Sequence, residues 1–323
     1  MAELLLELYS EEIPPQLQIG ARNQLKEFVE KPLKEDNIKY KDLLVYSSPT
    51  RLTLLIKDLA EKIKIEAKEV KGPKVGSPDQ VLQGFIKAKN VLEKDLIEKE
   101  TEKGKFYFIK TQPQLILVED LLVKIIPKAI SSINWKKSMK WSDHSLMWGR
   151  PLRSIFARFN NKKLLFKFDH LETTDEIIIE QDLTIKTRKI KDFKDYLSFL
   201  KSNKIIVNHQ EREEIILKKI NSFSQSKQYK EHLNPKLLEE VVNIVEDPNL
   251  LHVSFNKDYL KIPQEIIIST LEKHQRYFPI FDSRDRLTNY FFVVANKKDE
   301  KKLITQGNKR VVEARLADAK FFW

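Results

Sequence analysis

The chain has 323 residues, a length that suits two or three domains, and 41% of its residues are hydrophobic, enough for ordinary cores. It has no cysteine, which excludes disulfides and thiolate metal sites, and no apolar run approaches the roughly 20 residues of a membrane span. Lys and Arg number 58 against 47 Asp and Glu, and the net charge of +11 indicates either a polyanionic partner such as nucleic acid or the lysine-rich composition of an AT-rich genome.

The first residues alternate as a strand does, and they carry glutamates but no basic leader. We therefore expect no targeting peptide and a cytoplasmic location. A helix is predicted at 16–35, with Pro15 favourable at its first turn, and strands at 2–8 and 43–57 flank it. Hydrophobic periodicity predicts further elements up to residue 190: helices at 79–90 and 119–133, hairpins at 97–111 and 154–168, and β structure at 177–190.

From Asp192 the pattern becomes richer in helices. The predicted elements are helices at 192–203, 210–226, 235–246, 263–277 and 307–323, and short strands at 205–207, 278–281 and 289–294. This mixture predicts an α+β fold of mixed sheets and packed helices, with one region at 1–190 and a helix-rich continuation at 191–323. The last helix stops on three consecutive aromatics, from which we expect a chain that once continued.

The segment from Trp135 to Arg153 holds three of the four tryptophans, interleaved with cationic side chains. Cations suit phosphates and aromatic planes suit unstacked bases, so the segment is a candidate RNA-binding surface. The alternative is the edge of a tryptophan-lined core with solvated lysines around it. The candidate binding residues are Lys136, Lys137, Lys140, Trp141, Arg150 and Arg153.

A second dense polar cluster includes His274-Gln-Arg-Tyr277. On a helix, Lys273 and Arg276 share one face while His274 and Tyr277 share the next, so these four could hold a phosphate or a base edge. The alternative is an exposed helix end whose cations complement the helix dipole.

The sequence predicts no catalytic centre. The six histidines show no paired-ligand spacing, so we expect no metal site. With seven glycines there is little material for a phosphate-binding loop, and neither a Walker loop nor a GxGxxG motif occurs, so we expect no ATP site and no cofactor in this chain. No serine or cysteine nucleophile motif accompanies a histidine.

Seven short motifs follow one another along the chain: Ser10–Pro15, Ser48–Leu52, Lys71–Pro73, Ser138–Trp141 with Arg150-Pro151, Val245–Pro248, His274–Phe278, and Gly307–Val312 with Ala314–Phe322. Each motif alone is a modest signal. In this order across the whole chain they resemble the beta subunit of the bacterial tetrameric glycyl-tRNA synthetase.

The resemblance implies a subunit of the ligase that joins glycine to its tRNA with ATP. In this family the alpha subunit carries the class II catalytic core, with ATP and Mg, and the beta subunit serves tRNA recognition and full activity. Its N-terminal part resembles the editing-type module of the phenylalanyl-tRNA synthetase beta subunit. The family continues with an HD-type domain and an anticodon-binding domain, which we expect to be absent here. Because no ATP site can be found in the sequence, the chain alone is expected to be inactive.

Three functions stay open at this stage. The first is a non-catalytic tRNA-binding and scaffolding part, with the alpha subunit and glycine tRNA as partners. The second is an editing-type hydrolase of mischarged tRNA, which is less needed because a glycine pocket already excludes larger side chains. The third is a structural arm that docks the alpha subunit. In the last helix, Arg310 and Arg315 are candidates for RNA or partner binding, with buried ion pairing as the alternative, and Phe321–Trp323 are candidates for a domain junction.

Overall fold

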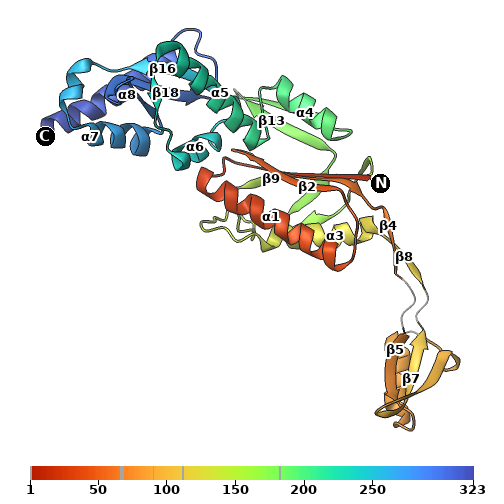
Figure 1. The fold of residues 1–323 in the computed structure, drawn as a ribbon. Coiled ribbons are helices and arrows are strands. Elements are labelled where there is room, and N and C mark those ends of the chain that lie inside the picture. Colours follow the sequence, from red (N-terminus) through yellow and green to blue (C-terminus); the bar gives the residue numbers. More distant parts are fainter. Residues whose placement is uncertain (1, 66–68, 90, 111–112, 182) are drawn as a thin grey trace. The chain divides into compact units, whose positions relative to one another are not determined.

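The computed structural model falls into two compact units, one of residues 1–59 with 123–323 and one of residues 60–122. It describes residues 2–65, 69–89, 91–110, 113–181 and 183–323 (Figure 1). The sequence did not predict the small unit as a separate body. The boundary predicted between residues 190 and 191 falls inside the larger unit and stays a prediction.

A seven-stranded sheet organises the first part of the larger unit. The strand order is β11-β12-β9-β1-β3-β2, with β10 paired to β9, and the only parallel pair among the described strands is β12 with β9. The strands are β1 (Ala2–Ser10), β2 (Asp42–Ser48), β3 (Arg51–Leu59), β9 (Leu152–Phe159), β10 (Lys162–Lys163), β11 (Lys167–Phe168) and β12 (Leu171–Thr174).

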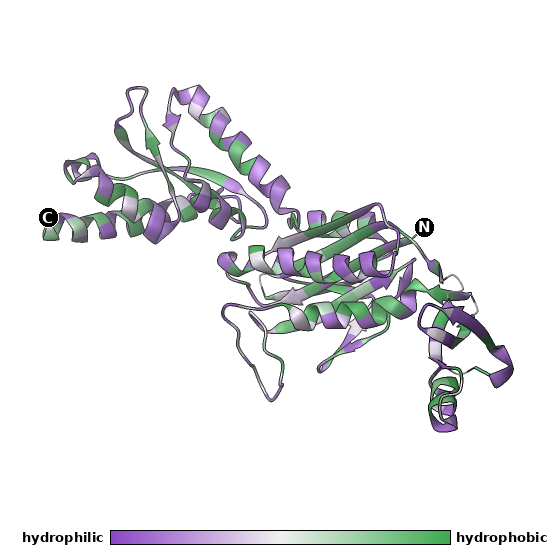
Figure 2. Ribbon diagram, turned by 60° about the horizontal axis from the view of Figure 1, so that its bottom comes forward, coloured by the Kyte–Doolittle hydropathy of each residue, from purple (hydrophilic) through white to green (hydrophobic). Residues whose placement is uncertain are grey.

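Each face of this sheet meets a different layer, because successive side chains of a strand point to opposite faces. Leu5 of β1 packs with the hairpin β13-β14 and with α4, while α1 turns its buried stripe of Ala21, Leu25, Val29 and Leu33 to the other face. Figure 1 shows α1 and α3 on one side of the sheet and α4 on the other, and Figure 2 shows hydrophobic colouring along its strands. These elements are α1 (Pro15–Glu35), α3 (Val118–Ser132), β13 (Glu176–Gln181), β14 (Thr184–Lys189) and α4 (Phe193–Ser202).

The second part of the larger unit is a four-stranded sheet between two helical layers. Along β18, Phe292 packs with α5 and α6, whereas Phe291 and Val293 pack with α7 and α8. The elements are α5 (His209–Lys227), β15 (Lys230–Glu231), α6 (Pro235–Val242), β16 (Asn249–Ser254), a 3-10 turn (Lys257–Lys261), α7 (Gln264–Ser269), a π-helical turn (Thr270–Gln275), β17 (Phe278–Phe281), β18 (Leu287–Ala295) and α8 (Leu303–Phe322).

The small unit contains a three-stranded sheet of order β5-β7-β6, one helix and a separate two-stranded pair, β4 with β8. Its elements are β4 (Lys62–Ile65), β5 (Glu69–Lys74), α2 (Asp79–Lys89), a 3-10 turn (Glu93–Asp95), β6 (Leu96–Thr101), β7 (Gly104–Lys110) and β8 (Gln114–Leu117). The predicted hairpin around Gly104 is confirmed, since β6 and β7 pair antiparallel on either side of it.

Most predicted elements are confirmed, and five are wrong in part. The strand predicted at 43–57 is two antiparallel strands, β2 and β3, joined by a tight turn. The segment 205–207 is not a strand, because its backbone groups form their hydrogen bonds outside any sheet. The side chains of Ile205 and Val207 are buried. The helix predicted at 235–246 ends at Val242, and the one at 263–277 changes into a π-helical turn. In the hairpin predicted at 154–168, the returning strand is only β10, Lys162–Lys163, which pairs with the end of β9. No helix in the described part of the chain is both long and apolar enough to cross a membrane.

Candidate nucleic-acid-binding surfaces

The tryptophan segment, Trp135 to Arg153, lies between α3 and β9 and includes the first two residues of β9. Two of its tryptophans belong to the core: Trp135 and Trp148 are 9% and 2% exposed, with ring centroids 4.8 Å apart. A Cβ on Gly149 would lie 2.4 Å from the Trp135 ring, so glycine is required for this approach. The backbones of Met139 and Trp148 exchange hydrogen bonds of 2.9 and 3.2 Å. For these two tryptophans the core-edge interpretation is confirmed.

The cations of the same segment are exposed. Lys136, Lys137, Lys140 and Arg150 all project from it, and none of them forms an ion pair with any residue that the structure describes. Arg150 Nη1 lies 3.8 Å from the sulfur of Met139. The four side chains therefore keep their charge available to a solvent-side anion.

Trp141 lies at the edge of a cluster of polar rings. Its ring centroid is 6.5 Å from that of His144 and 6.0 Å from that of His170, and the two imidazoles stack 3.5 Å apart. Asp169 accepts hydrogen bonds from Ser145 Oγ at 2.7 Å and pairs with His170 Nδ1 at 2.7 Å, and these bonds lower the pKa of its carboxyl. The Asp169 carboxylate lies between the His170 imidazole and the Ser145 hydroxyl. His170 is therefore not placed to act as a general base on Ser145.

Arg153 is already engaged by carboxylates. Its Nη1 pairs with Glu11 Oε1 at 3.1 Å and also contacts Glu180 Oε2, while its guanidinium lies 6.0 Å from the centre of the Tyr9 ring. Two acidic partners offset its charge, which makes Arg153 a weaker candidate for a phosphate contact than Arg150.

The predicted helical arrangement of the second cluster is wrong. The helix passes into a π-helical turn over Thr270–Gln275, and Arg276 ends it in the left-handed region, with φ 62°. Tyr277 is buried at 9% exposure, stacks 5.3 Å from Phe291, and donates its hydroxyl to Asn308 of α8. Tyr277 is therefore a core residue and not a surface group.

The rest of this cluster divides between paired and free side chains. Arg276 Nε pairs with Glu240 Oε1 at 2.8 Å, and the same oxygen accepts from Gln16 Nε2 at 2.8 Å. Lys273 and His274 are exposed and belong to no ion pair in the described residues. Of the four predicted residues, these two are left facing solvent.

In α8, Val312 and Leu316 are fully buried against the second sheet. Arg310 and Arg315 are exposed, and neither pairs with a carboxylate among the residues that the structure describes, so the interpretation as buried ion pairs is wrong. The ring of Phe322 is 85% exposed, and its role at a domain junction stays a prediction.

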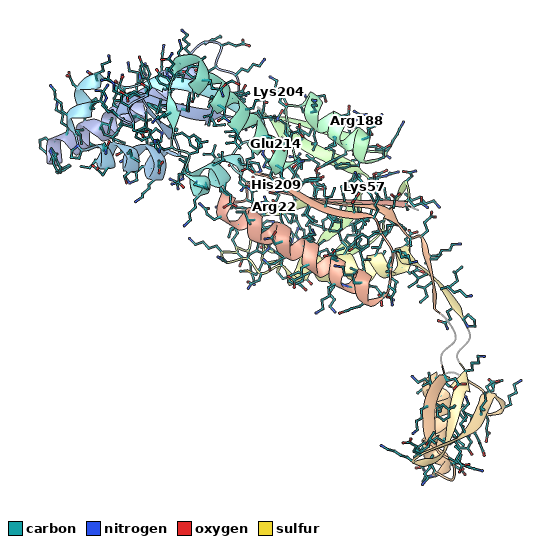
Figure 3. The ribbon with its side chains drawn as sticks, viewed as in Figure 1. Arg22, Lys57, Arg188, Lys204, His209 and Glu214 are labelled. Atoms are coloured by element: carbon teal, nitrogen blue, oxygen red, sulfur yellow. The ribbon has the colours of Figure 1, made fainter. Side chains whose placement is uncertain are left out.

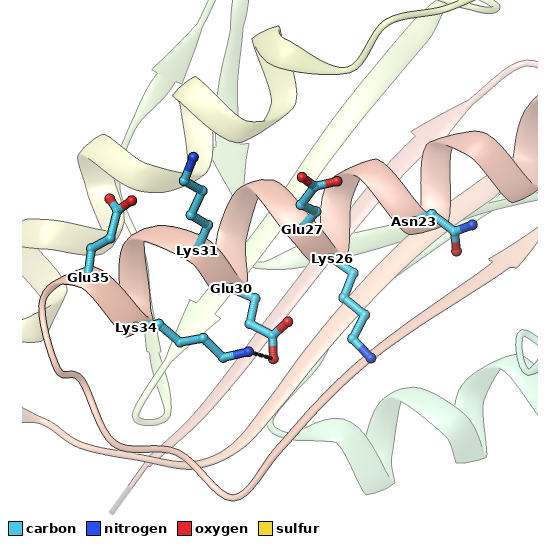
Figure 4. A pocket seen from close by; sticks show the side chains of 7 residues that line it. All are labelled: Asn23, Lys26, Glu27, Glu30, Lys31, Lys34 and Glu35. Carbon is cyan, nitrogen blue, oxygen red and sulfur yellow. Dashed lines mark ion pairs between the residues drawn. The ribbon is translucent and has the colours of Figure 1, made fainter.

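The charged surface of α1 offers no site. All residues that line the hollow in Figure 4 belong to this one helix: Asn23, Lys26, Glu27, Glu30, Lys31, Lys34 and Glu35. Lys34 Nζ pairs with Glu30 Oε1 at 3.0 Å, one turn apart. Because one helix supplies the whole lining, this is grooved helix surface and not a cleft. Within the described residues, no group of three or more His, Asp or Glu is arranged to hold a metal ion.

A buried ionic network lies where the first sheet meets the second part of the larger unit. Arg51, 2% exposed, pairs through Nε with Glu7 Oε2 at 3.1 Å, and its Nη1 lies 3.7 Å from Glu246 Oε1. Glu7 also accepts from the Tyr196 hydroxyl at 2.6 Å, and Glu246 accepts from Ser48 Oγ at 2.6 Å. Burial raises the pKa of Glu7, while Arg51 and the Tyr196 hydroxyl oppose that rise.

A family model described as the glycyl-tRNA synthetase beta subunit matches residues 4–323. The chain belongs to the glycyl-tRNA synthetase beta subunit family. It is 35% identical over its whole length to the glycine–tRNA ligase beta subunits of Rickettsia typhi and Rickettsia peacockii, and 34% identical to that of Rickettsia bellii. It covers 48 to 49% of these proteins, so the chain spans about half the length of the relatives it matches.

Two of the motifs along the chain bind each other. In Ser48–Leu52, the hydroxyls of Ser48 and Thr50 donate to Glu246 of Val245–Pro248, at 2.6 and 3.2 Å. Both peptide N–H groups of Glu246 and Asp247 donate to Asn296. These motifs therefore join the two parts of the larger unit.

Sequence reasoning missed Arg212, which is fully buried in α5. Its guanidinium donates to four backbone carbonyls: Val242 O at 3.0 Å, Ile206 O at 2.6 Å, Val207 O at 3.1 Å and Ser47 O at 2.9 Å. Burial lowers its pKa to about 10, so it stays charged at neutral pH. The only sequence signal was an arginine in register with Ile216 and Ile220 on the apolar side of the helix.

His209 is an acid-sensitive residue at the start of α5, where Figure 3 labels it beside Arg22. Burial, together with the nearby positive charges of Arg22 and Arg212, lowers its pKa from 6.5 to about 4. Between pH 6.5 and pH 4, this imidazole is protonated in the unfolded chain but stays neutral in the folded chain. Stability should therefore be complete above pH 6.5 and fall toward pH 4, by roughly 1–2 kcal/mol after allowing for partial exposure.

Urea unfolding of the wild type and of His209→Gln at pH 7 and pH 4.5 measures this effect. The variant should lose less stability than the wild type between the two pH values. An equal loss in both proteins would show that His209 does not contribute.

Proposed function

We propose that this chain is the tRNA-binding and scaffolding part of the beta subunit of a glycine–tRNA ligase. The family match over residues 4–323 carries the proposal, and the exposed cations of the tryptophan segment and of α8 support a phosphate-rich partner. Glycine tRNA and a catalytic alpha subunit are the proposed partners, in a cytoplasmic tetramer. ATP and Mg are then used on the alpha subunit.

The same proposal assigns the first sheet and its helices to a module like the editing-type module of the phenylalanyl-tRNA synthetase beta subunit, without hydrolytic activity. Two observations support this assignment: an α+β fold of mixed sheets, and a Ser145–Asp169–His170 chain in which no imidazole contacts the hydroxyl. A hydrolase would need that contact or another activated nucleophile.

The expected salt dependence of tRNA binding separates this function from that of a structural arm. The affinity of the chain for glycine tRNA should fall steeply with salt, and Lys136→Ala/Lys137→Ala/Lys140→Ala should reduce the slope of log K against log salt by up to about 2.7, or 0.9 for each lost phosphate contact. The matched control is Lys194→Ala/Lys201→Ala/Lys204→Ala, which removes three exposed lysines of α4 and its end.

Fluorescence anisotropy with labelled tRNA, with and without the alpha subunit, makes this measurement. A flat salt response of the wild type would favour the structural arm. A control variant that loses as much slope as the test variant would remove the tryptophan segment as the binding surface.

The chain alone should form no glycyl-tRNA from glycine, ATP and tRNA. No phosphate-binding loop is present in its sequence, and its proposed role supplies only binding surface. A charging assay with labelled glycine tests this, with the complete alpha and beta subunits as the positive control. Product above background from the chain alone would overturn the division of labour.

A further inference from the structure

The small unit has an open sheet face that the proposed function does not use. Alternation along β7 places Phe106 and Phe108 on one face, and Ile109, 1% exposed, on the other. A Cβ on Gly72 would lie 2.8 Å from the ring of Phe85, which places α2 over the face of Ile109. Phe106 and Phe108 remain partly exposed on the face away from α2.

Two lysines share the face of the phenylalanines. Lys71 lies opposite Phe108 and Lys99 opposite Phe106 in the strand register, so both lysines share the face of the phenylalanines. The Nζ of Lys71 lies 3.4 Å from the centre of the Phe106 ring, and that of Lys99 lies 5.8 Å from the Phe108 ring. A lysine ammonium therefore lies over each ring, and a base that stacks on Phe106 must displace that of Lys71.

One more lysine, Lys74, completes this face. A Cβ on Gly104 would lie 3.1 Å from Lys74 Cε, so the stem of Lys74 crosses the end of the same face. Lys99 pairs with Glu69 at 2.5 Å, while Lys71 and Lys74 have no ion pair within the described residues. We call Phe106, Phe108, Lys71, Lys74 and Lys99 the aromatic face. The alternate residues of β6, Glu98 and Glu100, fall on the opposite face, whereas Glu69, the partner of Lys99, lies on the side of the rings.

We propose that the aromatic face binds an unpaired segment of RNA, with bases stacked on Phe106 and Phe108 and phosphates held by Lys71 and Lys74. Aromatic rings on the central strand of a small sheet take unstacked bases, and neighbouring lysines supply the backbone charge. We expect a duplex not to bind this face, because its bases are stacked on one another and their planes cannot reach the phenylalanine rings. That the single strand is RNA rests on the proposed function. The proposed stacking rests only on the positions of the two rings.

The test uses the 323-residue chain and a labelled single-stranded RNA of about 12 nucleotides, a length within the usual site sizes. Phe106→Leu/Phe108→Leu keeps apolar side chains but removes the ring planes, and should weaken binding about tenfold. Lys71→Gln/Lys74→Gln should lower the slope of log K against log salt by about 1.4, or 0.7 for each contact with a single strand. Lys87→Gln/Lys105→Gln is the matched control, with two exposed lysines of the same unit off this face, and its slope should stay close to that of the wild type.

Circular dichroism and thermal melting check that each variant is folded, and the lysine pair keeps the test valid if the leucine pair melts early. Three results would each overturn the inference: wild-type affinity for the single strand in the leucine variant, equal affinity of the wild type for a duplex of the same sequence, or an equal loss of slope in the control pair. Binding of glycine tRNA is measured with the same proteins. If tRNA still binds with steep salt dependence while the leucine pair has no effect on the oligonucleotide, this inference fails and the proposed function stands.

Discussion

Replacing Arg212 with alanine should lower the free energy of unfolding by about 3–5 kcal/mol, because four buried carbonyls lose their donor at once and each unsatisfied group costs about 1–3 kcal/mol unless water replaces it. Those carbonyls belong to Val242, Ile206, Val207 and Ser47. The last is in β2, so this one side chain ties the first sheet to the helices that cover the second. The loss should appear as a lower midpoint in urea unfolding.

Arg212→Lys separates the contribution of the charge from that of the hydrogen-bonding geometry. Lysine keeps the charge, but its single ammonium cannot donate to all four carbonyls as the guanidinium does. The free energy of unfolding of Arg212→Lys should therefore lie between those of the wild type and Arg212→Ala. Arg284→Ala is the matched control, since Arg284 is exposed. If Arg212→Ala were no less stable than this control, the four hydrogen bonds would not be holding the two parts together.

Local patterns in the sequence were sufficient for most helices and strands. The α1 helix begins at Pro15, where a missing N–H is harmless, and Pro49 stands in the turn between β2 and β3. The π-helical turn after Ser269 could not be read this way, because the strand of Phe278 and the hydrogen bond from Tyr277 to Asn308 fix where the chain must leave the helix. Such constraints come from distant segments.

The candidate site was harder to predict than the fold. Lys136, Lys137 and Arg150 are exposed as predicted, but the sequence could not show that Glu11 and Glu180 would meet Arg153, since they lie 142 and 27 residues away. Glu7 is one of two carboxylates in β1, with Glu3, and the sequence reading did not single it out. Its partner could be found only once β1 and β3 were paired, with Glu7 opposite Thr53.

Replacing Arg51 with methionine should lower the free energy of unfolding by about 3–5 kcal/mol at neutral pH, because it leaves buried carboxylates without their cation. Glu7 is 1% exposed and would keep only the Tyr196 hydroxyl, at 2.6 Å. Glu246, within 3.7 Å of Arg51, would also lose its nearest positive charge. Urea unfolding at pH 7 measures the loss.

Adding Glu7→Gln to Arg51→Met should restore part of that loss, roughly 1–3 kcal/mol, because the second change removes the unpaired charge that the first one created. The pH dependence has a definite sign. Burial already raises the pKa of Glu7 above 4.5, and without Arg51 it rises further, so the folded single variant binds a proton more readily than the unfolded chain. The deficit of Arg51→Met against the wild type should therefore shrink as the pH falls from 7 toward 5, and in the double variant this shrinkage should disappear. A double variant less stable than Arg51→Met alone would mean that Glu7 stabilises the fold without its arginine, contrary to the network described above.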